Sequence, residues 1–158
     1  MEIREATGPV EDVGAEILVL FHSEDEPSPR GRLGRVDWIL CGALSRLRSR
    51  RKFAGEWGAT ALLSPEGKLK AGMVLVVGLG RQTDLSLVTL YRLSYLAAHT
   101  VLHLGCSRVA MEPPFRVFPR ETPTHVRQAF LDGFLAELRR GRPEASFSVT
   151  LLPPPNGA

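Results

Sequence analysis

The stretch Met73-Val74-Leu75-Val76-Val77-Gly78-Leu79-Gly80 decides the fold, because a continuous apolar run ends there in a Gly-x-Gly turn. A helix-like segment follows from Asp84, so the pattern predicts a buried strand that leads through a glycine turn to a helix N-terminus. Unpaired N–H groups and the helix dipole favour an anion at such a junction. Four residues therefore form a candidate site for a phosphate group: Gly78, Leu79, Gly80 and Arg81.

The spacing around this turn differs from the common nucleotide-binding motifs. Thr83 stands where a dinucleotide fingerprint has its third glycine, and no Lys-Ser or Lys-Thr pair follows as in a P-loop. Glycines also occur where the backbone needs an unusual conformation or close packing. The backbone role is the preferred interpretation of this turn, and binding of a phosphate or a nucleotide remains the alternative.

The rest of the chain alternates between strand and helix patterns. Apolar runs predict strands at residues 15–21, 60–63 and 108–111, and alternation predicts an edge strand at 147–151. Apolar residues at helical spacing predict helices over 36–49, from an N-cap at Asp84 to residue 104, and after Thr122-Pro123 to residue 138. This alternation predicts a three-layer α/β/α sandwich.

Length and composition indicate one globular domain. We expect it to span residues 1–152 of the 158, followed by a disordered tail over 153–158. The net charge is only +3, and no apolar run approaches the length that a membrane-spanning helix needs. Met1 is followed by charged residues rather than a secretory leader, so we expect a cytoplasmic protein. Cys41 and Cys106 are expected to be buried, reduced thiols.

Two features predict exposed surfaces. Residues 22–34 combine prolines, glycines and charges, so we expect an exposed, mobile loop that serves either as a ligand gate or as a passive linker. Trp38 lies opposite the apolar stripe of its helix, where it would meet either a partner or a loop of the same chain. We slightly favour the loop.

The remaining polar patterns give only weak indications of binding or catalysis. A basic run could contact nucleic-acid phosphates, although such runs are usually solvated; it comprises Arg46, Arg48, Arg50, Arg51 and Lys52. His99 and His103 have the spacing of two metal ligands, but the sequence lacks the glutamate of a zincin and an evident third ligand, so we expect no metal and no cofactor. No nucleophile elbow is present, and we expect no enzymatic activity.

The order of segments resembles the N-terminal domain of the leucyl (cytosol) aminopeptidase family. The similarity lies in Phe53-Ala54-Gly55-Glu56-Trp57-Gly58-Ala59-Thr60-Ala61-Leu62-Leu63, in the strand ending Val77-Gly78-Leu79-Gly80-Arg81, and in the helix containing Asp132-Gly133. The resemblance implies a macro-domain-like α/β/α fold with a mixed sheet. It does not imply peptidase activity, because that family carries its metals and catalytic residues in a second domain marked by Asn-Thr-Asp-Ala-Glu-Gly-Arg. The single Asn of this chain is Asn156.

The resemblance leaves three hypotheses. The first is a non-catalytic binding, assembly or regulatory module that pairs with itself or with a full-length aminopeptidase. The second is a macro-like domain for a phosphate, a nucleotide or ADP-ribose, although residues 19–22 lack the Asn residues that macro domains carry there, which argues against ADP-ribosyl hydrolysis. The third is association with DNA through residues 46–52, since some bacterial members of the family bind DNA.

Overall fold

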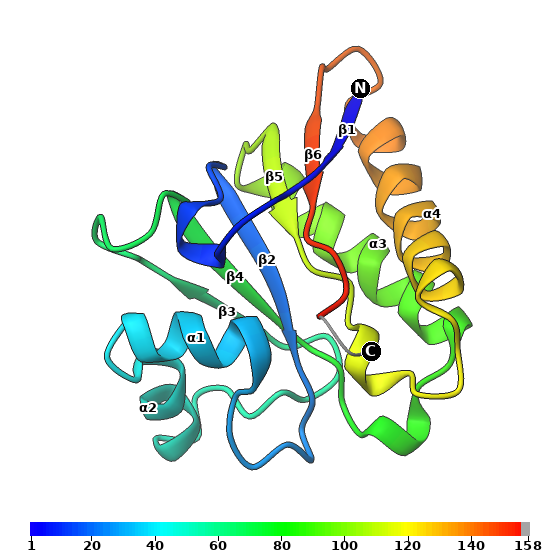
Figure 1. Cartoon of the computed structure of the whole chain (residues 1–158). Coiled ribbons are helices and arrows are strands. Elements are labelled where there is room, and N and C mark those ends of the chain that lie inside the picture. The colour runs from blue at the N-terminus through cyan, green and yellow to red at the C-terminus, as the bar shows by residue number, and fades with distance from the viewer. Residues whose placement is uncertain (156–158) are drawn as a thin grey trace.

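The computed structural model describes residues 1–155, and its centre is a mixed six-stranded sheet with strand order β1-β6-β5-β2-β4-β3 (Figure 1). All neighbouring strands are parallel except β3, which is antiparallel to β4. The strands are β1 (Glu2–Glu5), β2 (Ile17–His22), β3 (Thr60–Leu63), β4 (Met73–Gly78), β5 (Arg108–Met111) and β6 (Ser148–Leu151). The helices are α1 (Gly31–Ile39), α2 (Ala43–Ser49), α3 (Leu87–His103) and α4 (Pro123–Gly141), with 3-10 turns η1 (Val10–Asp12), η2 (Gln82–Asp84) and η3 (Phe115–Val117).

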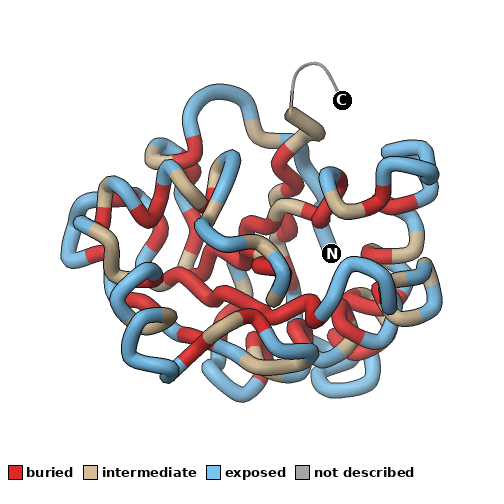
Figure 2. Tube along the Cα trace, turned by 90° about the horizontal axis from the view of Figure 1, so that it is seen from below, coloured by how far each residue is buried: buried red, intermediate tan, exposed pale blue. Residues whose placement is uncertain are grey.

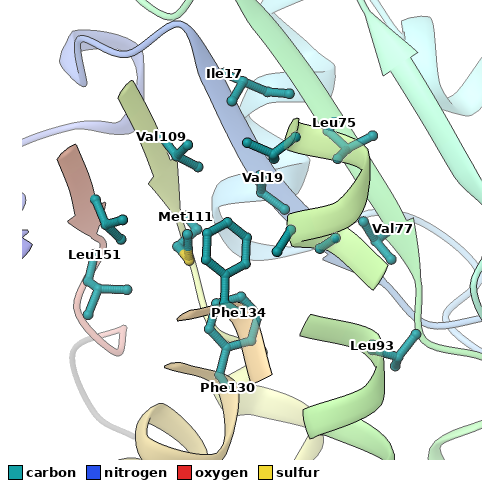
Figure 3. Close-up of a cluster of buried hydrophobic side chains, with 14 of the residues drawn as sticks. Ile17, Val19, Leu75, Val77, Leu93, Val109, Met111, Phe130, Phe134 and Leu151 are labelled. Carbon is teal, nitrogen blue, oxygen red and sulfur yellow. The ribbon is translucent and has the colours of Figure 1, made fainter. Parts of the chain in front are cut away.

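The helices form a layer on each face of the sheet, which confirms the predicted three-layer sandwich. Side chains alternate between the two faces of a strand, so Leu18 and Leu20 pack toward α1 and α2 while Ile17 and Val19 pack toward α3 and α4. Phe130 and Phe134 of α4 are fully buried on the second face, where Figure 3 shows their rings against the sheet. Figure 2 shows that the buried residues concentrate in the centre of the molecule.

The helix predicted over residues 36–49 is two helices. Cys41 adopts φ 57° and Gly42 φ 77°, and this left-handed turn separates α1 from α2. Asp37 caps the second helix, because its buried carboxylate accepts hydrogen bonds from the N–H groups of Leu44 (2.8 Å) and Ser45 (3.2 Å). The prediction that Cys41 is buried is therefore wrong, whereas Cys106 is buried as predicted.

The start of α3 also differs from the prediction. The N-cap is Ser86, whose side chain accepts from the N–H of Thr89 while the Thr89 hydroxyl accepts from the N–H of Ser86. Asp84 belongs to η2 instead. Thr122 does cap α4, with Pro123 in its first turn, as predicted.

The strand predicted at the C-terminal edge lies inside the sheet. β6 pairs with β5 on one side and with β1 on the other, so the edge is β1, whose exposed residues Glu2–Glu5 had no strand pattern. The alternation of β6 reflects partial cover of Ser148 and Thr150 rather than an edge position.

The segment between β2 and α1 is less open than predicted. His22 and Ser23 are buried, and α1 already begins at Gly31. Trp38 is 74% exposed, so the favoured interpretation that it meets a loop is wrong. Pro153–155 of the expected tail carry no helix or strand, and residues 156–158 lie outside the described part. None of the helices described has the length and apolarity that crossing a bilayer requires.

Candidate functional site

The carboxyl ends of β2 and β4 meet at one edge of the sheet, where ligands commonly bind in α/β folds. His22, the last residue of β2, lies opposite Gly78, the last residue of β4. The loop after β5 begins with Glu112 and reaches the same edge through Arg116. The candidate residues Gly78, Leu79, Gly80 and Arg81 thus lie at the position that the fold favours for a ligand.

The N–H groups of the glycine turn are bound within the chain. Gly78 donates to the carbonyl oxygen of Ala59 (2.7 Å), Leu79 to that of His22 (2.9 Å) and Gly80 to that of Gly55 (2.8 Å). A Cβ at Gly78 would overlap the backbone at residues 55–56, and Gly80 has φ +71°. These glycines therefore allow close approach of two chain segments, and their N–H groups are not free to hold a phosphate.

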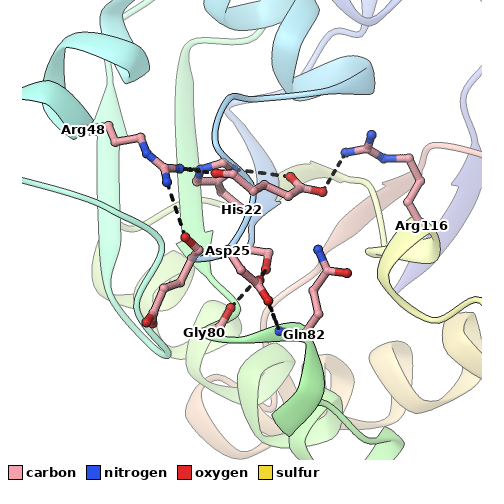
Figure 4. A network of polar contacts seen from close by, with 9 residues as sticks. His22, Asp25, Arg48, Gly80, Gln82 and Arg116 are labelled. Carbon is pink, nitrogen blue, oxygen red and sulfur yellow. Dashed lines mark hydrogen bonds and ion pairs between the residues drawn. The ribbon is translucent and has the colours of Figure 1, made fainter.

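A carboxylate of the chain binds the N–H of Gln82, two residues beyond Gly80. Asp25 lies 3.2 Å from the N–H of Gln82 through each of its oxygens, at the start of η2 (Figure 4). Ser23 donates to the same carboxylate and also contacts the carbonyl oxygen of Gly80 (3.1 Å). The Ser23 hydroxyl, aided by the Gln82 N–H, lowers the pKa of Asp25. A carboxylate of the protein thus lies beside the turn that the sequence offered as a candidate phosphate site.

His22 lies on the other side of this edge, with its ring fully buried. Arg48 of α2 reaches its Nε2 (2.8 Å), and because arginine only donates, Nε2 accepts and Nδ1 carries the hydrogen. Burial, reinforced by Arg48 and Arg116, lowers the pKa of His22 to about 4, so the ring is neutral at pH 7. Among residues 1–155, its Nδ1 has no hydrogen-bond partner, and the Glu26 carboxylate lies 3.6 Å away.

Two further arginines are paired with acceptors of this chain. Arg32 of α1 contacts the Glu112 carboxylate (2.5 Å) and the carbonyl oxygen of Pro153 (2.7 Å), and Arg116 lies 3.5 Å from Glu26. Burial raises the pKa of Glu112, an effect that Arg32 opposes. These pairs leave a cavity of about 20 Å³ between the loops that follow β2 and β5. The space between these two loops is therefore nearly filled by side chains of the protein, whereas an open groove of about 700 Å³ lies beside it, between residues 82–88 and 117–121.

The predicted basic run does not form one surface. Arg48 points inward to His22 and to the carbonyl oxygens of Glu24 and Glu26, while Arg46 binds the carbonyl oxygen of Cys41. Arg50, Arg51 and Lys52 are exposed at the end of α2. Only part of the run is therefore available to a phosphate backbone.

The two histidines of α3 lie beside each other with ring centroids 5.9 Å apart. His99 contacts the buried carboxylate of Glu137 on α4 through Nδ1 (2.9 Å). Within residues 1–155, the structure has no group of three or more His, Cys, Asp or Glu side chains arranged to hold a metal ion. His99 therefore contributes to the contact between α3 and α4.

Sequence reasoning missed Asp25, His22 and Glu112 as members of this edge. Asp25 was placed in a mobile loop, because its partner Gln82 is far away in the sequence. One signal was present, since polar residues directly after a buried parallel strand lie at the edge where ligands bind. That signal locates the edge, but it does not reveal that the polar groups pair with one another.

Comparison with known proteins gives relatives of two kinds. A probable cytosol aminopeptidase of Geobacter sp. (strain M21) is 44% identical over 94 residues, which are 59% of this chain and 18% of that protein. A mutant of tomato leucine aminopeptidase has a similar fold over the whole of this chain and 33% of its own, with a TM-score of 0.74 and 20% identity. A Trypanosoma brucei macrodomain in complex with ADP is similar over 95% of this chain and 61% of its own, with a TM-score of 0.71 and 16% identity.

The structural likeness to the macrodomain confirms the predicted macro-like fold. The chain spans only 18% to 27% of the length of the curated relatives that it matches. The sequence model described as the N-terminal domain of the cytosol aminopeptidase family matches residues 17–137. On this match, together with the segments quoted above, the chain belongs to the cytosol aminopeptidase family and corresponds to its N-terminal domain.

Proposed function

We propose that this chain is a non-catalytic assembly or regulatory module that acts in the cytoplasm through contacts with other proteins. The observation that carries the proposal is that the N–H groups of the glycine turn and the nearby Arg32, Arg48 and Arg116 are paired within the chain. The N–H groups of residues 78–80 bind backbone carbonyls, and Asp25 occupies the N–H of Gln82. A ligand would have to displace these internal bonds, and each lost partner would leave a buried polar group unsatisfied.

The surface supports the same function, because large apolar side chains are exposed on and beside β3. Leu62 is 49% exposed, Trp57 46% and Leu96 39%. Exposed apolar side chains that gather in a patch often mark contact surfaces for other proteins. The proposal therefore assigns function to the outer faces of the fold.

Two measurements on the purified chain test this proposal. We expect no hydrolysis of leucine anilides after loading with zinc or manganese, and no heat in calorimetry with ADP-ribose up to about millimolar concentration. Hydrolysis that a chelator abolishes would refute the non-catalytic role. Saturable heat of ADP-ribose binding would favour the ligand-binding function over the assembly function.

A second candidate function, binding of a small anionic ligand, is supported by the buried polar groups around His22. No acceptor for its Nδ1–H is found in the part of the chain that the structure describes, Arg48 contacts its Nε2, and the charge of Arg116 helps to lower its pKa. A ligand phosphate that displaced the Glu26 carboxylate could accept from Nδ1 and pair with Arg116. The Glu26→Gln variant tests this, because it weakens the internal competitor. Phosphate binding that appears or tightens in this variant would support the second function, and its absence in both proteins would exclude it.

A further inference from the structure

We propose that two copies of this chain join edge to edge through β3, antiparallel about a two-fold axis, so that their sheets become continuous. This inference rests on the assembly function proposed above and names its partner, a second copy. Its basis is the difference between the two edges of the sheet, together with the side chains that flank β3.

The two edges differ in charge. β1 presents Glu2, Arg4 and Glu5 along four exposed residues, and charged side chains are a common protection against pairing of edge strands. β3 reads Thr60-Ala61-Leu62-Leu63 and carries neither a charge nor a proline. The sheet is therefore protected at β1 and open to a further strand at β3.

The register of β3 defines which backbone groups point outward. The N–H of Gly78 donates to the carbonyl oxygen of Ala59, so residues 59, 61 and 63 face β4 in the alternating antiparallel ladder. The backbone groups of Thr60 and Leu62 consequently point away from β4. A further strand would find two N–H donors and two carbonyl acceptors there.

A two-fold axis through Ala61 pairs these groups with their own copies. Thr60 then lies opposite Leu62 of the second copy, and the converse pair is equivalent. Each such pair exchanges two hydrogen bonds, so two pairs give four bonds. Thr60 and Leu62 also share one face of the strand, so the two-fold brings the same sheet face of both copies together.

The side chains around β3 form an uncharged patch that suits contact with an identical surface. We call Trp57, Leu62 and Leu96 the β3-edge patch. Leu62 belongs to β3, and Trp57 lies three residues before the strand. Leu96 of α3 adjoins this segment, because its Cδ1 lies 3.8 Å from where a Cβ of Gly58 would be. The neighbouring Glu56 turns back toward the N–H of Ala54 (3.2 Å). The three side chains of the β3-edge patch are uncharged, so contact between the patches of two copies involves no repulsion between like charges.

Four backbone bonds and a small patch favour a weak dimer, with Kd on the order of 100 µM. Sedimentation of the whole chain from about 1 µM to about 1 mM should show a reversible monomer–dimer equilibrium. Leu62→Lys should weaken it at least about tenfold, since each copy would bring an ammonium group to the shared edge. Trp38→Lys is the matched control, because it replaces an exposed apolar residue by lysine on α1 and should leave the equilibrium unchanged.

Hydrogen exchange locates the contact, and Thr60→Pro provides a second variant. Amide exchange at Thr60 and Leu62 should slow as concentration rises. Thr60→Pro removes an N–H that only the second copy would use and should also weaken the dimer. Circular dichroism at low concentration should show that each variant keeps its fold.

The outcomes separate this inference from the proposed function. A dimer that Trp38→Lys abolishes and Leu62→Lys preserves would overturn the β3 contact while supporting assembly. A chain that stays monomeric at about 1 mM would also overturn it. So would protection of Thr60 and Leu62 seen only when a β-strand peptide is added, which would assign the edge to a different protein. The proposed function itself is refuted by different results, namely hydrolysis of leucine anilides or saturable heat of ADP-ribose binding.

Discussion

Replacing Glu137 by Gln should make the stability of this protein less dependent on pH in the acidic range. The Glu137 carboxylate is only 1% exposed although it lies between two surface helices. Its Oε2 accepts from Arg140 Nε (2.7 Å), and its Oε1 accepts from Arg140 NH2 (2.9 Å) and His99 Nδ1 (2.9 Å). Arg140 above all, with Tyr95 and His99, lowers the pKa of Glu137 to about 2, against the opposing effect of burial.

The magnitude follows from this pKa. A fall from the ordinary 4.5 to about 2 corresponds to at most about 3 kcal/mol of folding free energy. Arg140 and His99 are 63% and 56% exposed, so solvent screening reduces the expected contribution to about 1–2 kcal/mol. Because the pKa is lower in the folded state, this stabilisation is complete above about pH 4.5 and is lost as the pH falls toward 2.

Urea unfolding between about pH 2 and pH 7 measures the effect. The wild-type free energy of unfolding should exceed that of Glu137→Gln at neutral pH, and the two curves should converge at low pH. Glu144→Gln is the matched control, because Glu144 is exposed near the same helix end and should change neither value. Parallel wild-type and Glu137→Gln curves over the whole range would refute the reasoning.

Three further predictions concern the core, the glycine turn and the cysteines. Phe134→Ala should lower the free energy of unfolding by about 3–5 kcal/mol in urea titration, since Phe134 is fully buried. Gly78→Ala should lower the free energy of unfolding by about 1–3 kcal/mol or prevent folding, because the added Cβ would overlap backbone atoms. Gly14→Ala should change it little, because Gly14 has open space around it, and equal effects of the two substitutions would contradict this reasoning. In thiol titration at neutral pH, exposed Cys41 should react at once and Cys106 only after unfolding, since burial raises the pKa of Cys106; simultaneous reaction would contradict its burial.

Most helices and inner strands could be predicted because their signals are local. The uninterrupted apolar run of β2 and the run of β4 indicate strands covered on both faces, and both are buried. Thr122 followed by Pro123 predicts the start of α4 from adjacent residues alone. Such patterns depend on backbone propensity and on side chains a few positions apart, so they can be recognised without knowledge of the tertiary contacts.

The sequence located the candidate site, but it did not show whether the hydrogen-bond donors of the site are free or already paired. The Gly-Leu-Gly turn, which the sequence singled out, lies at the edge where ligands bind in this class of fold. Whether its N–H groups are free depends on Ala59, His22 and Gly55, which approach it from other segments of the chain. The same holds for Gln82, whose N–H faces a carboxylate 57 positions away in the sequence.

The sequence by itself determined the layered α/β architecture, the family, and the glycine turn at the end of β4. Only the tertiary structure decided that β6 is an inner strand, that Arg48 turns inward, and that Asp25 binds the N–H of Gln82 beside the glycine turn. The physical reason is the range of the interactions. Hydrophobic periodicity depends on residues close together in the sequence. The partners of a backbone N–H or a charged side chain depend on which distant segments the fold brings together.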